Sequence, residues 1–198
     1  MDMKESNGHI ILMMGPTGSG KGSLVRHIKE KFPDVKCAVS CTTREKRPHE
    51  THGVEYYFVS KEEFKQKIEH EEFLEWAEFS GNYYGTLKSE IVERLENNQV
   101  ILNEIELQGV QQLLPLLDDS QRTVVYLEAG QWDVLEARAK ARAPISEEHL
   151  ALRHERYLEE IKMKPYADVV IDNTNGQLEQ ANRTIETLVQ KIFDNIDA

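Results

Sequence analysis

Short apolar runs alternate with amphipathic segments along this chain, a pattern that predicts strands alternating with helices. The first run, His9–Met14, precedes a glycine-rich turn and then apolar residues at helical spacing, which predicts strand, loop and helix. Three further short runs rich in β-branched residues are predicted strands: 98–102, 121–127 and 167–172. Residues 178–196 present one apolar face and form the predicted closing helix. The pattern predicts an α/β fold around a parallel core sheet.

Two polar segments interrupt this alternation. Residues 39–96 contain a Pro/Gly/charge-rich stretch, an aromatic cluster and an acidic helix, and we interpret them as an inserted small subdomain. Residues 131–162 are rich in charged residues and alanine, with apolar residues and arginines at helical spacing, so they predict a helical flap. The predicted core of this single domain is then about 8–38, 97–130 and 163–198.

Composition narrows the class of partner. The chain has 198 residues, with 24 Lys+Arg against 35 Asp+Glu and a formal net charge of −11, which disfavours broad contact with nucleic acid or anionic membranes. No apolar run is long enough to span a bilayer, and the charged start 1–8 is unlike a secretory signal. Cys37 and Cys41 form neither a disulfide framework nor a zinc motif. We expect a cytoplasmic protein that gathers basic residues locally around any anionic ligand.

The turn after the first strand fits the pattern G-x-x-x-x-G-K, and it lies between a strand and a helix as that motif requires. Such a loop points backbone N–H groups at phosphate oxygens, and its lysine reaches the β- and γ-phosphates. We therefore predict an ATP site at Gly15, Pro16, Thr17, Gly18, Ser19, Gly20, Lys21, Gly22 and Ser23.

The hydroxyl that usually follows the motif's lysine is displaced in this chain. Gly22 occupies that position, and the hydroxyl comes one residue later, at Ser23. We expect Mg²⁺ as a cofactor, with no direct protein ligand assigned. Ser23 or Glu104 would contact the Mg²⁺ ion through a water molecule.

Three further segments carry a family resemblance. They are Ser40–Pro48 (SCTTREKRP), Gly53–Val59 (GVEYYFV) and Phe73–Thr86 (FLEWAEFSGNYYGT), and Leu107–Val110 (LQGV) follows them. Together with the phosphate loop they closely resemble the guanylate kinase signature, in order and spacing, from about Ile10 to Leu158. The resemblance implies a P-loop kinase that phosphorylates GMP, and dGMP, at the expense of ATP.

The resemblance also assigns the acceptor site. It implies that the GMP phosphate is held by Ser40, Arg44, Arg47, Tyr56 and Tyr84, and that guanine is read by Glu75, Thr86 and Glu106. Independently, two arginines three residues apart can present planar donor forks to one phosphate. Guanine offers N1–H and the 2-amino group as adjacent donors to a carboxylate, whereas adenine has an acceptor at N1. The acids therefore favour guanine. Glu106 stands where the family usually has Asp.

The flap carries three arginines that match the family's lid: Arg138, Arg142 and Arg153. With Lys21 and Arg44 they are the predicted catalytic cations, because phosphoryl transfer depends mainly on alignment and positive charge. The lid turn reads Arg142-Ala143-Pro144, and Pro144 is expected to stiffen it.

Two other functions stay open at this stage. One is a related P-loop kinase for another small phosphorylated acceptor, and the other is a non-catalytic guanylate-kinase-like module that binds phosphopeptides. Retention of Lys21, the lid arginines and the guanine-reading acids favours the enzyme. The sequence leaves both monomer and homodimer open.

Overall fold

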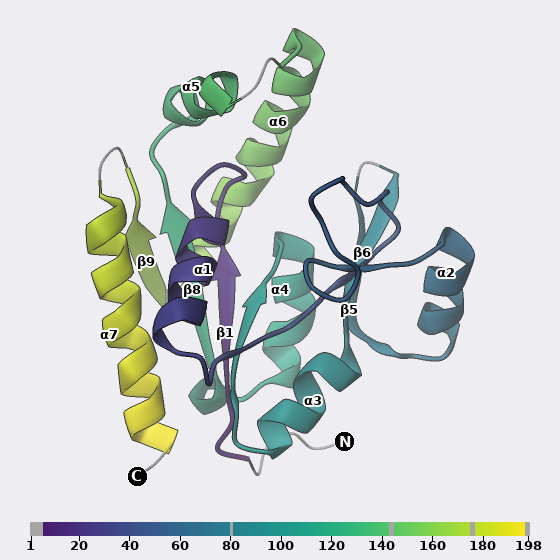
Figure 1. The fold of residues 1–198 in the computed structure, drawn as a ribbon, viewed down its shortest axis with the longest axis vertical. Helices are drawn as coiled ribbons and strands as arrows, with labels where there is room; N and C mark the ends of the chain where they lie inside the picture. Colours follow the sequence, from purple (N-terminus) through teal and green to yellow (C-terminus); the bar gives the residue numbers. More distant parts are fainter. Residues whose placement is uncertain (1–5, 80, 143–144, 175–176, 197–198) are drawn as a thin grey trace.

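The computed structural model describes residues 6–79, 81–142, 145–174 and 177–196 (Figure 1). Its centre is a five-stranded sheet in the order β2-β7-β1-β8-β9, and each neighbouring pair is parallel. The predicted parallel core is confirmed. The strands are β1 (His9–Met14), β2 (Lys36–Cys37), β7 (Val100–Glu104), β8 (Arg122–Glu128) and β9 (Val169–Asp172).

Alternating residues of β1 supply the two halves of the core. Ile10 and Leu12 pack with helices α3 (Lys88–Glu96) and α4 (Leu107–Leu113) on one face of the sheet. Ile11 and Met13 pack with α1 (Lys21–Lys31) and α7 (Leu178–Ile196) on the other. All four β1 side chains are fully buried. The continuous apolar run of β1 is therefore explained by a strand that is covered on both faces.

The segment 39–96 forms a second, four-stranded sheet in the order β4-β3-β6-β5, seen to the right in Figure 1. Its elements are β3 (Cys41–Thr42), β4 (Tyr57–Phe58), α2 (Lys61–Glu69), β5 (Phe73–Phe79) and β6 (Asn82–Leu87). A separate small core holds Cys41, Phe64 and Phe73, with the two phenylalanine rings stacked at 4.3 Å. The helix α3, although it lies within the same segment, packs against the parallel sheet.

Two helices form the flap above the sheet, α5 (Trp132–Arg142) and α6 (Glu147–Glu160) (Figure 1). Trp132 of α5 contacts His154 and Tyr157 of α6, with ring centroids 4.8 and 5.8 Å away, so aromatic packing joins the two helices. The side chain of Arg142 and the residues Ala143 and Pro144 lie outside the described residues.

Short 3₁₀ turns complete the fold at η2 (Leu114–Leu116), η3 (Asp119–Gln121) and η4 (Ile161–Tyr166). Across the described part of the chain, every helix is too short or too polar to cross a membrane.

Candidate active site

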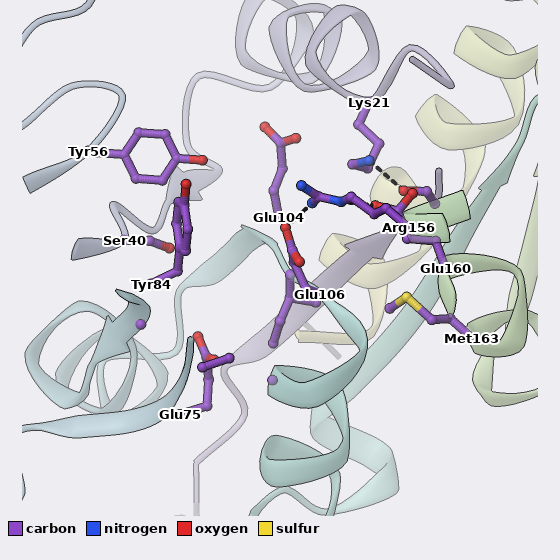
Figure 2. Close-up of a pocket in the computed structure, with 15 residues that line it drawn as sticks. Lys21, Ser40, Tyr56, Glu75, Tyr84, Glu104, Glu106, Arg156, Glu160 and Met163 are labelled. Carbon is purple, nitrogen blue, oxygen red and sulfur yellow. Dashed lines mark hydrogen bonds and ion pairs between the residues drawn. The ribbon is translucent and has the colours of Figure 1, made fainter. Parts of the chain in front are cut away.

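A cleft of about 180 Å³ opens where β1 and β7 end, between the second sheet and the base of the flap (Figure 2). Side chains from all three parts meet there. The described residues that line it are Gly15, Lys21, Ser40, Tyr56, Glu75, Ala77, Tyr84, Gly85, Glu104, Ile105, Glu106, Gly109, Arg156, Glu160 and Met163.

The glycine-rich loop forms one wall of the cleft. Its glycines adopt conformations that other residues rarely take, with φ of 143° at Gly15 and 104° at Gly20, the residue that precedes α1. A Cβ at position 15 would stand 2.5 Å from the backbone oxygen of Leu127, so the loop packs directly onto β8. The loop geometry is therefore tied to these glycines.

Lys21 folds back over this loop. Its Nζ donates to the backbone oxygens of Gly15, at 2.5 Å, and Pro16, at 3.3 Å. Burial lowers the pKa of Lys21, and the carboxylates of Glu160 and Glu104 oppose that shift. The Oγ of Ser19 is buried and has no hydrogen-bond partner among the described residues. A bound phosphate or hydrated cation at the loop would supply one.

A carboxylate already sits against this loop. Glu160, at the end of α6, is 7% exposed and accepts from the backbone N–H of Thr17 at 2.9 Å. The Thr17 hydroxyl donates to the same carboxylate at 3.3 Å. The base of the flap is thus bonded to the loop that precedes α1.

The opposite wall carries Glu75 of β5. Its carboxylate is 8% exposed and accepts from the Thr86 hydroxyl at 2.6 Å across the β5–β6 pair. Burial raises the pKa of Glu75 to about 7, the Thr86 hydrogen bonds oppose the rise, and the charge of Glu106 adds to it. Glu75 is thus a buried, oriented acceptor that titrates near neutral pH.

Hydroxyl groups gather between the two walls. Ser40, Tyr56 and Tyr84 line the cleft, and the two tyrosine rings meet edge to face at 6.2 Å. The Ser40 hydroxyl lies 3.4 Å from that of Thr86. These neutral donors lie on the same side of the cleft as Glu75 (Figure 2).

Arg44 lies next to Tyr56. Its guanidinium donates both Nη atoms to the carboxylate of Glu50, at 2.8 and 3.1 Å, and stacks over the Tyr56 ring at 5.6 Å. Glu50 is 6% exposed, and hydrogen bonds from Arg44 hold the pKa of its carboxyl below the usual range. Arg47 donates its backbone N–H to Glu50, while its side chain is 62% exposed.

Glu106 and Arg156 both line the cleft and pair with each other. The Arg156 guanidinium, from α6, forms an ion pair with Glu106 and a second one with Glu160, the latter at 2.7 Å. Figure 2 shows the Arg156 side chain reaching across the cleft toward Glu106.

Comparison with known proteins identifies the family. The family model described as "Guanylate kinase" matches residues 7–192. The chain belongs to the guanylate kinase family.

Named relatives agree with that assignment. The chain is 40% identical to the guanylate kinase of Synechococcus sp. (strain ATCC 27144 / PCC 6301 / SAUG 1402/1), over 93% of this chain and 98% of that protein. It is 38% identical to that of Synechococcus sp. (strain JA-3-3Ab), over 93% and 83%. The crystal structure of guanylate kinase from Anaplasma phagocytophilum matches with a TM-score of 0.72 at 25% identity, covering 94% of this chain and 87% of that one. The resemblance and the α/β fold predicted from sequence are both confirmed.

The structure brings several of the predicted site residues of this guanylate kinase family member into one cleft, and leaves others outside its lining. Lys21, Ser40, Tyr56, Glu75, Tyr84, Glu104 and Glu106 line it. Thr86 stands behind Glu75, and Arg44 and Arg47 lie in the adjoining loop. Among the lid arginines, Arg138 donates to the backbone oxygen of Asn173 at 3.0 Å and Arg153 is exposed on α6. The roles assigned to these residues stay predictions.

Three contributors were missed. Glu50, Arg156 and Glu160 all sit at or beside the cleft with their charges paired. Sequence offered a signal for two of them, since Arg156 and Glu160 are four residues apart on a predicted helix and so share a face. Glu50 follows Arg47 by three residues in a proline-containing loop, where no periodicity indicates which side chains meet.

Proposed function

We propose that this member of the guanylate kinase family transfers the γ-phosphoryl group of ATP to GMP, giving GDP and ADP. The observation that supports this most directly is the single cleft that joins the lysine of the phosphate loop to the buried carboxylate of Glu75. The family assignment points to the same reaction.

Recognition of guanine follows from the acceptor wall. Glu75 is held by Thr86, so its oxygens have a defined direction, and Glu106 lies at the same cleft. The guanine edge presents N1–H and the 2-amino group, which need such acceptors. Adenine would set its N1 lone pair against a buried carboxylate, a contact that loses a hydrogen bond and leaves the acid unpaired.

The phosphate of GMP would lie among Ser40, Tyr56 and Tyr84, with Arg44 held beside them by Glu50. A monophosphate carries close to two negative charges, so a guanidinium and several hydroxyl donors balance and orient it. Both GMP and dGMP are proposed acceptors, because these named contacts involve the base and the phosphate.

The ATP phosphates would occupy the loop 15–23, beside Lys21 and the Ser19 hydroxyl, which has no hydrogen-bond partner among the described residues. Oxygen atoms are the ligands that Mg²⁺ prefers, and the residues present fit a cation held through water, by Glu104 or Ser23, and by the nucleotide. Mg²⁺ would neutralise charge that develops on the phosphates during transfer. The residues of this chain align donor and acceptor from opposite walls.

The flap would close the top of the cleft. Arg138, Arg142 and Arg153 are the proposed lid cations that approach the transferring group, and closure would exclude the water that competes for ATP. The cytoplasm is the proposed location.

A comparison of wild type with Glu75→Gln tests the proposal. Steady-state rates are measured with GMP and AMP at equal Mg²⁺ and ATP. The wild type should prefer GMP strongly, and the variant should lose about ten- to a hundredfold in kcat/KM for GMP, because the neutral amide has one acceptor oxygen and donors that face N1–H. The AMP rate should stay level or rise. A wild type that phosphorylates AMP as well as GMP would contradict the proposal, as would an unchanged ratio in the variant.

A further inference from the structure

Arg156 is bonded to carboxylates from two different parts of the molecule. Its Nε donates to Glu160 of the same helix at 2.7 Å, and its Nη2 pairs with Glu106, which precedes α4. The two carboxylates are 54 residues apart in the chain, and the Arg156 side chain is only 25% exposed. Such a pairing fixes the guanidinium in one direction across the cleft.

The contacts continue to the phosphate loop. Glu160 accepts from Arg156 through Oε1 and from the Thr17 backbone N–H through Oε2. A continuous series of hydrogen bonds therefore runs from Thr17 through Glu160 and Arg156 to Glu106. Thr17 belongs to the proposed ATP loop, and Glu106 is one of the two acids proposed to contact guanine. Figure 2 shows Glu160, Arg156 and Glu106 of this series.

The two guanine-facing acids differ in how they are held. Glu75 is buried and bonded by Thr86 within the second sheet. The Glu106 side chain is 51% exposed, and its Oε1 pairs with Arg156. A carboxylate has lone pairs on both oxygens, so Oε2 of Glu106 can still accept from a ligand while Arg156 holds Oε1.

Charge points to the same arrangement. Two carboxylates that face one neutral base edge repel each other, and the charge of Glu106 acts on Glu75 in this sense. The guanidinium of Arg156 balances the charge of the second acid through its ion pair with Glu106. Arg156 would thereby keep Glu106 directed at the base.

We propose that Arg156 is a positioning residue that fixes Glu106 for recognition of the 2-amino group of guanine and links that carboxylate to the phosphate loop through Glu160. The proposal rests on the proposed function, since it deepens the assignment of the guanine site. The lower end of the flap, where Arg156 lies, would then help to select guanine. This role is separate from that proposed for the lid arginines nearer the tip of the flap.

The test compares two acceptors that differ only in the 2-amino group. GMP carries it, whereas inosine monophosphate has the same O6 and N1–H without it. Calorimetric titration of wild type and Arg156→Gln with each nucleotide gives the discrimination ratio. We expect GMP affinity to fall by about tenfold, the effect of loosening a charged hydrogen-bond acceptor, with inosine monophosphate affinity nearly unchanged. The ratio of GMP affinity to inosine monophosphate affinity should therefore fall by about tenfold.

Two further variants control the test. Lys162→Gln removes one positive charge just beyond α6, where Lys162 pairs with the exposed Glu159, and should leave the ratio as in wild type. Arg156→Lys retains a cation and should keep part of the wild-type ratio. This variant also allows the test if Arg156→Gln does not fold. In Glu106→Gln the added change of Arg156→Gln should cost little more, because both act through one contact.

Equal losses for both nucleotides in Arg156→Gln would overturn the proposal, as would an unchanged ratio or additive losses in the double variant. Binding and turnover separate this inference from the proposed reaction. A wild type that binds GMP but does not phosphorylate it would overturn the proposed reaction. The ratio of the two binding affinities would still test the proposed role of Arg156.

Discussion

Gly109 of α4 packs directly against the carboxylate of Glu75: a Cβ at position 109 would stand 2.6 Å from Glu75 Oε2 and 2.7 Å from Ile105 Cγ1. Because residue 109 has no side chain, the Glu75 carboxylate of β5 can lie directly against α4. The Leu107–Val110 motif thus has a steric reason for its glycine.

Gly109→Ala should displace the Glu75 carboxylate. Overpacking of this kind costs about 1–3 kcal/mol of stability, and the displaced acceptor should raise the KM for GMP while the KM for ATP changes little. Chemical denaturation and initial-rate kinetics measure the two effects. Gln111→Ala, at an exposed position of the same helix, is the control. An alanine variant with unchanged KM for GMP would show that Glu75 tolerates the shift.

Glu75 should make stability depend on pH. Its carboxyl has a folded-state pKa of about 7 against an ordinary 4.5, so the folded protein binds the extra proton between these values. Stability from this group is fully present below about pH 4.5 and is lost as pH rises through 7. The wild type should therefore lose about 3 kcal/mol relative to Glu75→Gln between pH 4.5 and 8. Urea unfolding of both proteins across this range checks the difference, which stays constant if the carboxyl titrates normally.

Lys21→Ala should separate the donor site from the acceptor site. Lys21 bonds to the phosphate loop, whereas the proposed GMP contacts come from the second sheet. Turnover should fall by about 10²- to 10³-fold, the range for losing one charge-stabilising donor, while calorimetric GMP affinity stays near that of wild type. A parallel loss of GMP affinity would mean that Lys21 belongs to both sites.

Glu50→Gln should weaken the hold on Arg44. The amide can accept from one Nη atom but not from both, and the fork would lose its fixed direction beside Tyr56. GMP affinity should fall by about tenfold, with little change for guanosine, which has no phosphate. Glu45→Gln is the matched control, because Arg44 contacts only the backbone oxygen of Glu45. Equal losses of affinity for GMP and guanosine would mean that the substitution disturbs the fold of the loop and not the contact with the phosphate.

Local pattern was enough to predict the core of the fold. β1 is an apolar run because helices cover it on both faces. The run His9–Met14 is therefore enough by itself to predict a buried strand. The segment 39–96 was predicted as an insertion, but its four-stranded sheet was not. Its strands β3 and β4 have two residues each, too few to show a period.

The residues that share the cleft were predictable where a sequence motif groups them. The loop lysine, the acceptor hydroxyls and Glu75 belong to this group, and the structure brings them to one cleft. The pairings of Arg156 with Glu106 and of Arg44 with Glu50 were not predictable, since a charged residue in a polar segment looks the same whether it faces solvent or a partner 50 residues away. Only the fold decides between these cases.

The aromatic contact between Trp132 and the α6 rings has a practical consequence for spectroscopy. The chain contains two tryptophans, and they lie on separate parts, Trp132 on the flap and Trp76 on β5 of the four-stranded sheet. Each part therefore carries its own intrinsic fluorophore. Replacing either indole by phenylalanine leaves the other as a single optical label, so emission after rapid mixing with one nucleotide follows one part at a time.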